Sequence, residues 1–131
     1  MVEEISTWID SIISEHEKSR SCCSILFPHF KGFYPIDFLT NSYFVLVSEI
    51  PKPPLEDPAL SGFLDMDLDG ITYKNTYFIK ENCMDDAGLH FHELVHVAQW
   101  RLLGASAFVT RYISEYKDYG YRQAPLEVMA Y

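Results

Sequence analysis

The sequence has few cysteines and few positively charged residues, and it has no long hydrophobic run. Its 131 residues contain three cysteines, Cys22, Cys23 and Cys83. An odd number with two adjacent members does not fit a disulfide framework, so we expect reduced thiols that behave as small hydrophobic residues. Reduced thiols favour a reducing compartment, and we therefore predict a cytoplasmic protein.

Positive charge is scarce, because 10 Lys and Arg residues against 19 Asp and Glu residues leave a net charge of −9. Such a surface repels phosphate backbones and anionic lipids, which argues against nucleic acid or a membrane surface as the partner. No stretch is long and apolar enough to span a membrane, and the acidic opening MVEEISTWID lacks the pattern of a signal peptide. Hydrophobic residues make up 48% of the chain, which predicts a packed globular protein.

We expect a single α+β domain over residues 1–131, in three portions. Residues 1–50 form an N-terminal portion with a helix and a strand, and residues 51–60 form a proline-rich loop. Residues 61–131 form the portion that carries the chemistry. The expected architecture is a long helix packed on a small, mainly antiparallel sheet, with additional helices around it.

The expected elements follow from the spacing of apolar residues and from glycine, proline and asparagine at turns. They are an amphipathic helix through Ile5 and Ile13, an irregular segment over 21–40, a strand over 42–50, two short strands with turns at Asp69-Gly70 and Lys74-Asn75, a helix from Asp85 or Asp86 to Leu103, a helix over Ala105–Tyr116, and a last helix that opens at Pro125.

The stretch His92-Glu93-Leu94-Val95-His96 lies within the expected long helix. Residues four apart share one face of a helix, so His92 and His96 can bind one metal ion together, with Glu93 beside it. Apolar residues surround this helix on nearly every side, which predicts that it is buried and that its polar side chains need a partner. His90 points elsewhere, and we expect it to support the structure rather than to bind metal.

A third metal ligand is needed, because catalytic zinc usually takes three protein ligands and leaves one position open. No histidine follows the motif, and the downstream carboxylates are Glu115, Asp118 and Glu127. Glu115 and Asp118 lie in a polar stretch that we expect to be exposed, whereas Glu127 has apolar neighbours. We therefore predict Glu127 as the third ligand. The alternatives are Glu115 as the ligand, or a buried salt bridge from Glu127 to Arg111 or Arg122.

A second motif, Asp65-Met66-Asp67-Leu68-Asp69-Gly70, matches the opening of a calcium-binding EF-hand loop. Position twelve of such a loop carries a bidentate glutamate, and here it is Thr76. The flanking residues also favour strands over helices. We therefore interpret this run as a solvated acidic turn.

The motif together with a later helical glutamate resembles the gluzincin branch of zinc metallopeptidases. The stretches HELVHVAQWRLLG, FVTRYISEYKDYGY and PLEVMAY are similar to small bacterial and phage proteins of the zincin type, and the resemblance covers roughly Gly70 to Tyr131. It implies a zincin-like fold with a Zn²⁺ cofactor. The site residues that it implies are His92, His96 and Glu127 as zinc ligands and Glu93 as the general base.

The same resemblance implies that the strand around Thr72 to Ile79 is the sheet edge above the cleft, where a peptide or protein substrate pairs as an added strand. The chain departs from the family in two ways. The loop before Glu127 is longer, and no later histidine stabilises the oxyanion. Another residue has to take that role, and the candidates are Tyr112, Tyr116, Tyr119, Tyr121, Arg111 and Arg122.

The sequence thus predicts a zinc-dependent metallopeptidase that hydrolyses peptide bonds, with water activated by Glu93. One alternative is a zinc-binding, zincin-like module without general protease activity. The other is a metal-free interaction domain in which His92 and His96 are ordinary buried residues. No feature of the sequence indicates an oligomeric state.

Overall fold

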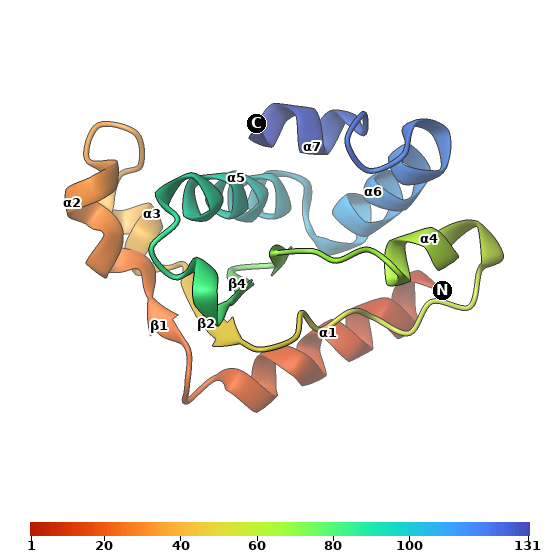
Figure 1. The fold of residues 1–131 in the computed structure, drawn as a ribbon, viewed down its shortest axis with the longest axis horizontal. Helices are drawn as coiled ribbons and strands as arrows, with labels where there is room; N and C mark the ends of the chain where they lie inside the picture. The colour runs from red at the N-terminus through yellow and green to blue at the C-terminus, as the bar shows by residue number, and fades with distance from the viewer.

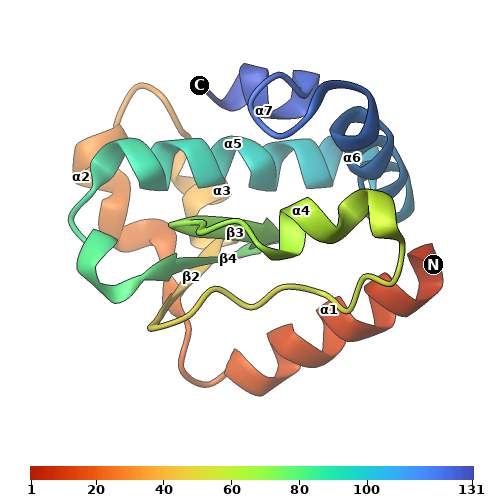
Figure 2. The same ribbon diagram turned by 45° about the vertical axis from the view of Figure 1, so that its right-hand side comes forward.

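A four-stranded sheet separates the N-terminal helix from the helix with the histidine motif in the computed structural model, which describes residues 1–131 (Figure 1). Figure 2 shows α5 (Ala87–Leu103) above the sheet and α1 (Val2–His16) below it. The strand order is β1-β2-β4-β3. The strands are β1 (Ser21–Cys22), β2 (Tyr43–Val47), β3 (Gly70–Tyr73) and β4 (Thr76–Lys80). The expected α+β class is confirmed.

The sheet is mixed, because its longest pairing, between β2 and β4, is parallel. The pairings of β1 with β2 and of β3 with β4 are antiparallel. The chain leaves β2, crosses through residues 48–69 and returns as a hairpin, and the second strand of that hairpin lies beside β2. The sheet edge near the motif is therefore β3 alone. The expectation that the edge extends to Ile79 is wrong, since Ile79 lies in the interior strand β4.

The remaining elements are short, except for one further helix that packs on α5. They are the 3₁₀ turns η1 (Cys23–Leu26), η2 (Pro58–Leu60) and η3 (Glu81–Cys83), and the helices α2 (Phe27–Phe30), α3 (Ile36–Thr40), α4 (Ser61–Leu64), α6 (Ala105–Tyr119) and α7 (Pro125–Ala130). The segment 21–40, expected to be irregular, contains two of these helices. None of the helices is long and apolar enough to cross a membrane.

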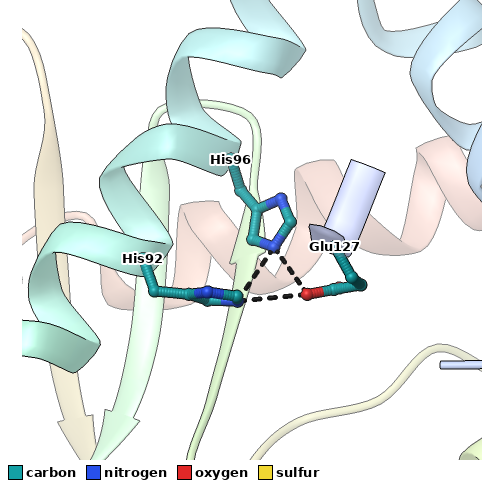
Figure 3. A group of neighbouring side chains, drawn as sticks. All are labelled: His92, His96 and Glu127. Carbon is teal, nitrogen blue, oxygen red and sulfur yellow. Dashed lines mark hydrogen bonds and ion pairs between the residues drawn. The ribbon is translucent and has the colours of Figure 1, made fainter. Parts of the chain in front are cut away.

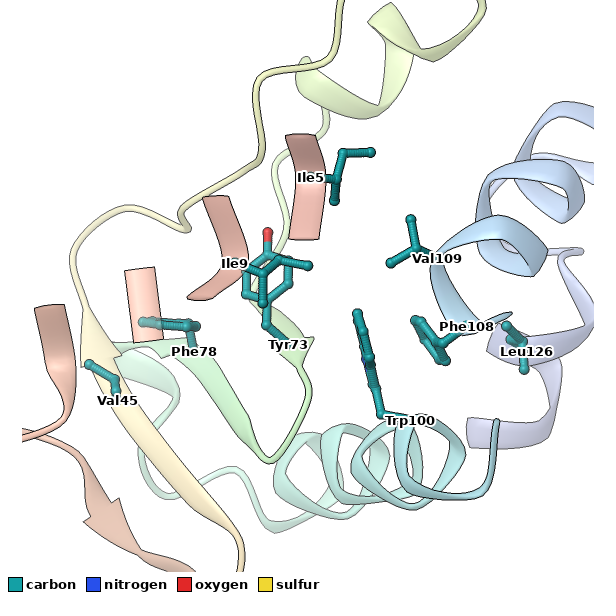
Figure 4. Close-up of a cluster of buried hydrophobic side chains, with 9 residues drawn as sticks. All are labelled: Ile5, Ile9, Val45, Tyr73, Phe78, Trp100, Phe108, Val109 and Leu126. Atoms are coloured by element: carbon teal, nitrogen blue, oxygen red, sulfur yellow. The ribbon is translucent and has the colours of Figure 1, made fainter. Parts of the chain in front are cut away.

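Alternation along β4 divides the interior into two clusters, because successive side chains of a strand point to opposite faces. Tyr77 and Ile79 face α5 and belong to a cluster with Leu94. Phe78 faces α1 and belongs to a second cluster, which Figure 4 shows. This second cluster contains Ile5, Ile9, Val45, Tyr73, Phe78, Trp100, Phe108, Val109 and Leu126. Segments on both sides of the proline-rich residues 51–60 thus pack around one core.

Both ends of α5 have the expected stop signals. The Asp86 carboxylate accepts a hydrogen bond of 3.0 Å from the Leu89 amide, which is an N-cap contact. Gly104 follows the helix with a φ of 82°, a conformation that favours glycine.

The turn at Lys74-Asn75 is also confirmed, whereas Gly70 is the first residue of β3 and not a turn centre. Leu102 is 86% exposed, so the expectation that α5 is buried all round is wrong at its last turn.

We expect Asp86→Ala to lower the free energy of unfolding by about 1 kcal/mol, because the first turn of α5 loses its cap. Urea denaturation measures this change. Asp85→Ala is the matched control, because Asp85 is also exposed but lies outside the cap contact. Equal losses in the two variants would contradict the capping role.

Candidate metal centre

Three buried side chains converge on one point between α5 and α7, as Figure 3 shows. The Nε2 atom of His92 lies 3.1 Å from Glu127 Oε1, and the Nε2 atom of His96 lies 3.0 Å from the same oxygen. The two Nε2 atoms are 3.2 Å apart. All three residues are at most 6% exposed. The structure thus brings together the three predicted ligands, and this group could hold a metal ion.

The triangle of ligand atoms has the size that a small tetrahedral ion requires. Zinc lies about 2.0–2.1 Å from histidine nitrogen and about 2.0–2.2 Å from carboxylate oxygen, which places neighbouring ligand atoms about 3.3 Å apart. The three edges of 3.0 to 3.2 Å come close to this value. The residues therefore fit a metal ion without rearrangement of the backbone.

The Gln99 amide fixes which nitrogen of His96 faces the centre. Gln99 Nε2 donates a hydrogen bond of 2.9 Å to the Leu126 carbonyl, which can only accept. The amide oxygen must then face His96 Nδ1, 2.7 Å away, so Nδ1 carries a proton. In neutral His96, the lone pair of Nε2 consequently points at Glu127 Oε1, and this arrangement repels unless a cation lies between them.

The charges at the site also indicate a need for a cation. Burial raises the pKa of Glu127, but hydrogen bonds from His92 and His96 outweigh burial and bring it down to about 2. Burial lowers the pKa of His96, but the hydrogen bond to Glu127 outweighs it and brings it up to about 9. In the absence of metal, a proton on an imidazole therefore balances the carboxylate. A divalent metal ion would replace that proton.

The position of Glu127 depends on two residues of α6. The Tyr112 hydroxyl donates a hydrogen bond of 2.6 Å to Glu127 Oε2, so one oxygen is held and the other faces the histidines. Glu115 Oε1 accepts a hydrogen bond of 2.7 Å from the Leu126 amide in the first turn of α7. Glu115 also forms an ion pair with Arg111 at 2.5 Å. The expectation that Glu115 is exposed is wrong, because it is 8% exposed and orients the helix that carries the third ligand.

Glu93 lies beside the three ligands, with its carboxylate held by the edge strand. Gly70 and Thr72 are two residues apart on β3, so both face α5. The Thr72 hydroxyl donates a hydrogen bond of 2.8 Å to Glu93 Oε1, and Glu93 Oε2 lies 3.8 Å from His92 Nε2. A Cβ atom at Gly70 would lie 3.2 Å from the Glu93 carboxylate, so any other residue here would force the carboxylate to move by a few tenths of an ångström. Burial raises the pKa of Glu93.

His90 does not point at the centre, as expected. Its Nδ1 atom lies 2.6 Å from the Tyr77 hydroxyl, and its Nε2 atom lies 2.8 Å from the Met84 carbonyl. His90 therefore connects the start of α5 to β4. In the acidic run Asp65–Gly70, Asp67 and Asp69 lie against Lys80.

Two pockets share Glu93 as a lining residue. A cleft of about 650 Å³ is lined by His92, Glu93 and residues of the loop 66–70, and both of these motif side chains are buried. An apolar cavity of about 90 Å³ lies on the other side and reaches Glu93, His96 and Glu127. Both pockets are also lined by Leu68, Gly70 and Tyr121. Glu93 is buried and thus lies between a cleft of mixed polarity and an apolar cavity.

The six candidates for oxyanion stabilisation lie in different surroundings. Tyr121 and Arg122 line the cleft together with the motif. Tyr112 is bound to Glu127, and Arg111 is bound to Glu115. The other two face the apolar cavity (Tyr116) or are 57% exposed (Tyr119). Tyr121 and Arg122 are therefore the two candidates that line the same cleft as His92 and Glu93.

Comparison of this chain with known protein families, curated proteins and solved structures finds no match.

We expect Gln99→Ala to weaken the binding of a divalent metal by about 10- to 100-fold, because His96 and α7 both lose the contact that orients them. Competition with a chromophoric chelator measures the affinity. Gln123→Ala is the matched control, because Gln123 is exposed and precedes the same helix. An unchanged affinity in Gln99→Ala would contradict the orienting role.

Proposed function

We propose that this chain is a zinc-dependent metallopeptidase of the gluzincin type, with a zincin-like arrangement of sheet edge and motif helix. One observation carries the proposal. The carboxylate of Glu93 lies beside a buried triad of His92, His96 and Glu127, and its free oxygen Oε2 lies 3.8 Å from His92 Nε2. This arrangement combines a site for a metal with a base next to it, as metal-assisted hydrolysis requires.

Zinc is the metal that the donor set favours. Two imidazole nitrogens and one carboxylate oxygen form the ligand set of many catalytic zinc sites, which keep a fourth position open. Calcium and magnesium prefer oxygen ligands alone. His92 and Glu93 both line the cleft, which supports an open position on a metal ion bound there. We therefore assign the site to Zn²⁺.

The residues of the chain divide the chemistry between them. A bound zinc ion would polarise the scissile carbonyl and lower the pKa of water at the open position. Glu93 accepts the proton of the attacking water through Oε2, because Thr72 occupies Oε1, and passes it to the leaving amine. Tyr121 or Arg122 stabilises the oxyanion from the wall of the cleft.

A peptide substrate has an edge to pair with in this arrangement. The Lys80 amide donates a hydrogen bond to the Asp69 carbonyl, so these two residues form a hydrogen-bonded pair of the antiparallel ladder. Hydrogen-bonded positions alternate along a strand, and the backbone groups of Gly70 and Thr72 consequently point away from β4. They can bind an extended peptide as an added strand beside Glu93.

We expect Glu127→Ala to weaken zinc binding by more than the roughly 10- to 100-fold that the loss of a supporting contact costs, because a direct ligand is removed. Chelator competition on the purified variant measures the affinity. Glu81→Ala removes an exposed glutamate outside the site and is the control. Zinc binding at the affinity of the unmodified protein would overturn the three-ligand site.

We expect Glu93→Gln to retain zinc and to lose hydrolysis by about 10²- to 10⁴-fold, because the amide fills the same space but takes up no proton. The assay is cleavage of unstructured proteins such as casein, with and without a chelator. Glu81→Gln serves as the matched control. A fully active Glu93→Gln variant would contradict the role of Glu93 as the base.

A second candidate function is a zinc-bearing module without general protease activity. The low exposure of the site favours it, since His92 is 6% exposed and Glu93 only 2%. A metal held in such a closed site can stabilise the fold without contacting a substrate. The same cleavage assay separates the two functions: zinc binding without chelator-sensitive cleavage of any unstructured substrate favours the module.

A further inference from the structure

One aromatic side chain lies directly on a candidate metal ligand. The ring of Tyr131, which follows α7, packs on the ring of His92 with centroids 4.4 Å apart and planes tilted by 46°. Figures 1 and 2 show this end of the chain above α5, the helix that carries His92. Tyr131 also lines the cleft together with His92 and Glu93. It thus covers His92 within the cleft.

We propose that Tyr131 is a movable cover of the candidate metal centre, and that its ring must rotate away before a peptide substrate reaches the metal ion and Glu93. The proposal rests on the proposed function and adds the control of access to it. The need for a movement is the first argument. His92 and Glu93 line the cleft but are only 6% and 2% exposed, whereas a catalytic metal ion needs an open position. Some residue of the cleft therefore has to move.

The freedom of Tyr131 is the second argument. Tyr131 is 80% exposed although its ring contacts His92, so the ring is held mainly from one side. It can rotate without displacing a core residue. Other parts of the cleft wall, at Leu68, Gly70 and Ala130, are buried. Tyr131 is therefore the part of the cleft at His92 that moves most easily.

An unpaired hydrogen-bond donor is the third argument. When His92 Nε2 binds a metal ion, Nδ1 carries the proton of the ring, and this atom is buried without a hydrogen-bond partner. A buried donor without a partner is unfavourable. Once Tyr131 rotates away, water or a substrate carbonyl can approach the His92 ring and accept this hydrogen bond. The covered arrangement is thus only weakly favoured, as a cover that opens requires.

Helix α7 couples the cover to the metal site. Glu127 and Tyr131 are four residues apart, so they lie on the same side of this helix. The Tyr131 amide donates a hydrogen bond of 3.3 Å to the Glu127 carbonyl, which ties the two residues together. The same short helix therefore supplies the third candidate ligand and places the cover on a ligand of α5.

The test measures zinc exchange in the full chain, because a cover slows the entry and the exit of the ion equally. Stopped-flow mixing of the zinc-loaded chain with a chromophoric chelator gives the dissociation rate, and mixing of the metal-free chain with Zn²⁺ gives the association rate. We expect Tyr131→Ala to raise both rates about three- to tenfold and to leave the Kd for zinc unchanged, since an aromatic contact of this kind is weak.

Three further variants complete the test. Tyr131→Phe keeps the ring and should keep the rates of the unmodified protein. Tyr131→Trp carries a larger ring and should slow both rates, a result that remains informative if Tyr131→Ala does not fold. Tyr119→Ala is the matched control and should change neither rate, because Tyr119 is also exposed but lies outside the cleft.

The outcomes separate the cover from the function. Faster dissociation without faster association in Tyr131→Ala would mean a weakened metal site and would overturn the cover. Unchanged rates in both Tyr131→Ala and Tyr131→Trp would also overturn the cover and leave the metal site standing. An unmodified chain that binds no zinc would overturn the proposed function, and the cover with it.

Discussion

Two imidazole nitrogens and one carboxylate oxygen meet within 3.2 Å in the interior of this protein, and such a meeting requires a cation. The orientation of Gln99 strengthens the requirement, because it leaves a lone pair of His96 facing Glu127. In the absence of a metal ion, a proton on an imidazole supplies the positive charge that balances Glu127. With a metal ion, the same atoms would match the ligand set of a catalytic zinc site.

Several tertiary contacts serve to bring these atoms together. Helix α7 has only six residues, and short helices are marginal on their own. Its first turn is held at Leu126 by Glu115 from α6 and by Gln99 from α5. The edge strand β3 positions Glu93. Gly70 leaves room for the Glu93 carboxylate, and the Thr72 hydroxyl donates a hydrogen bond to one of its oxygens. Glu127 and Glu93 are thus held from opposite sides of α5.

The sequence predicts much of this site because its signals are local. The spacing of His92 and His96 follows from the helical repeat, and the caps at Asp86 and Gly104 define the helix that carries them. Glu127 is identified by its apolar neighbours, since an isolated carboxylate in such surroundings needs a cationic partner. These inferences need no knowledge of long-range contacts.

The parts that the sequence does not predict depend on tertiary structure. Glu115 lies in a polar stretch, so the sequence predicts that it is exposed. In the structure it is buried, because α7 packs beside it. Thr72 and Gly70 alternate along a strand, which predicts a shared face but not that Glu93 lies opposite. The parallel pairing of β2 with β4 likewise follows from the crossover through residues 48–69, whose path is not encoded in any local pattern.

Elemental analysis of protein purified without added metal and without a metal-affinity tag tests the central claim most directly. The account predicts about one zinc per chain, bound by His92, His96 and Glu127. Protein that contains no zinc, takes up none on reconstitution and melts at the same temperature in chelator would contradict it. The triad would then be a buried, protonated ion pair, and the hydrolytic function would fall with the metal.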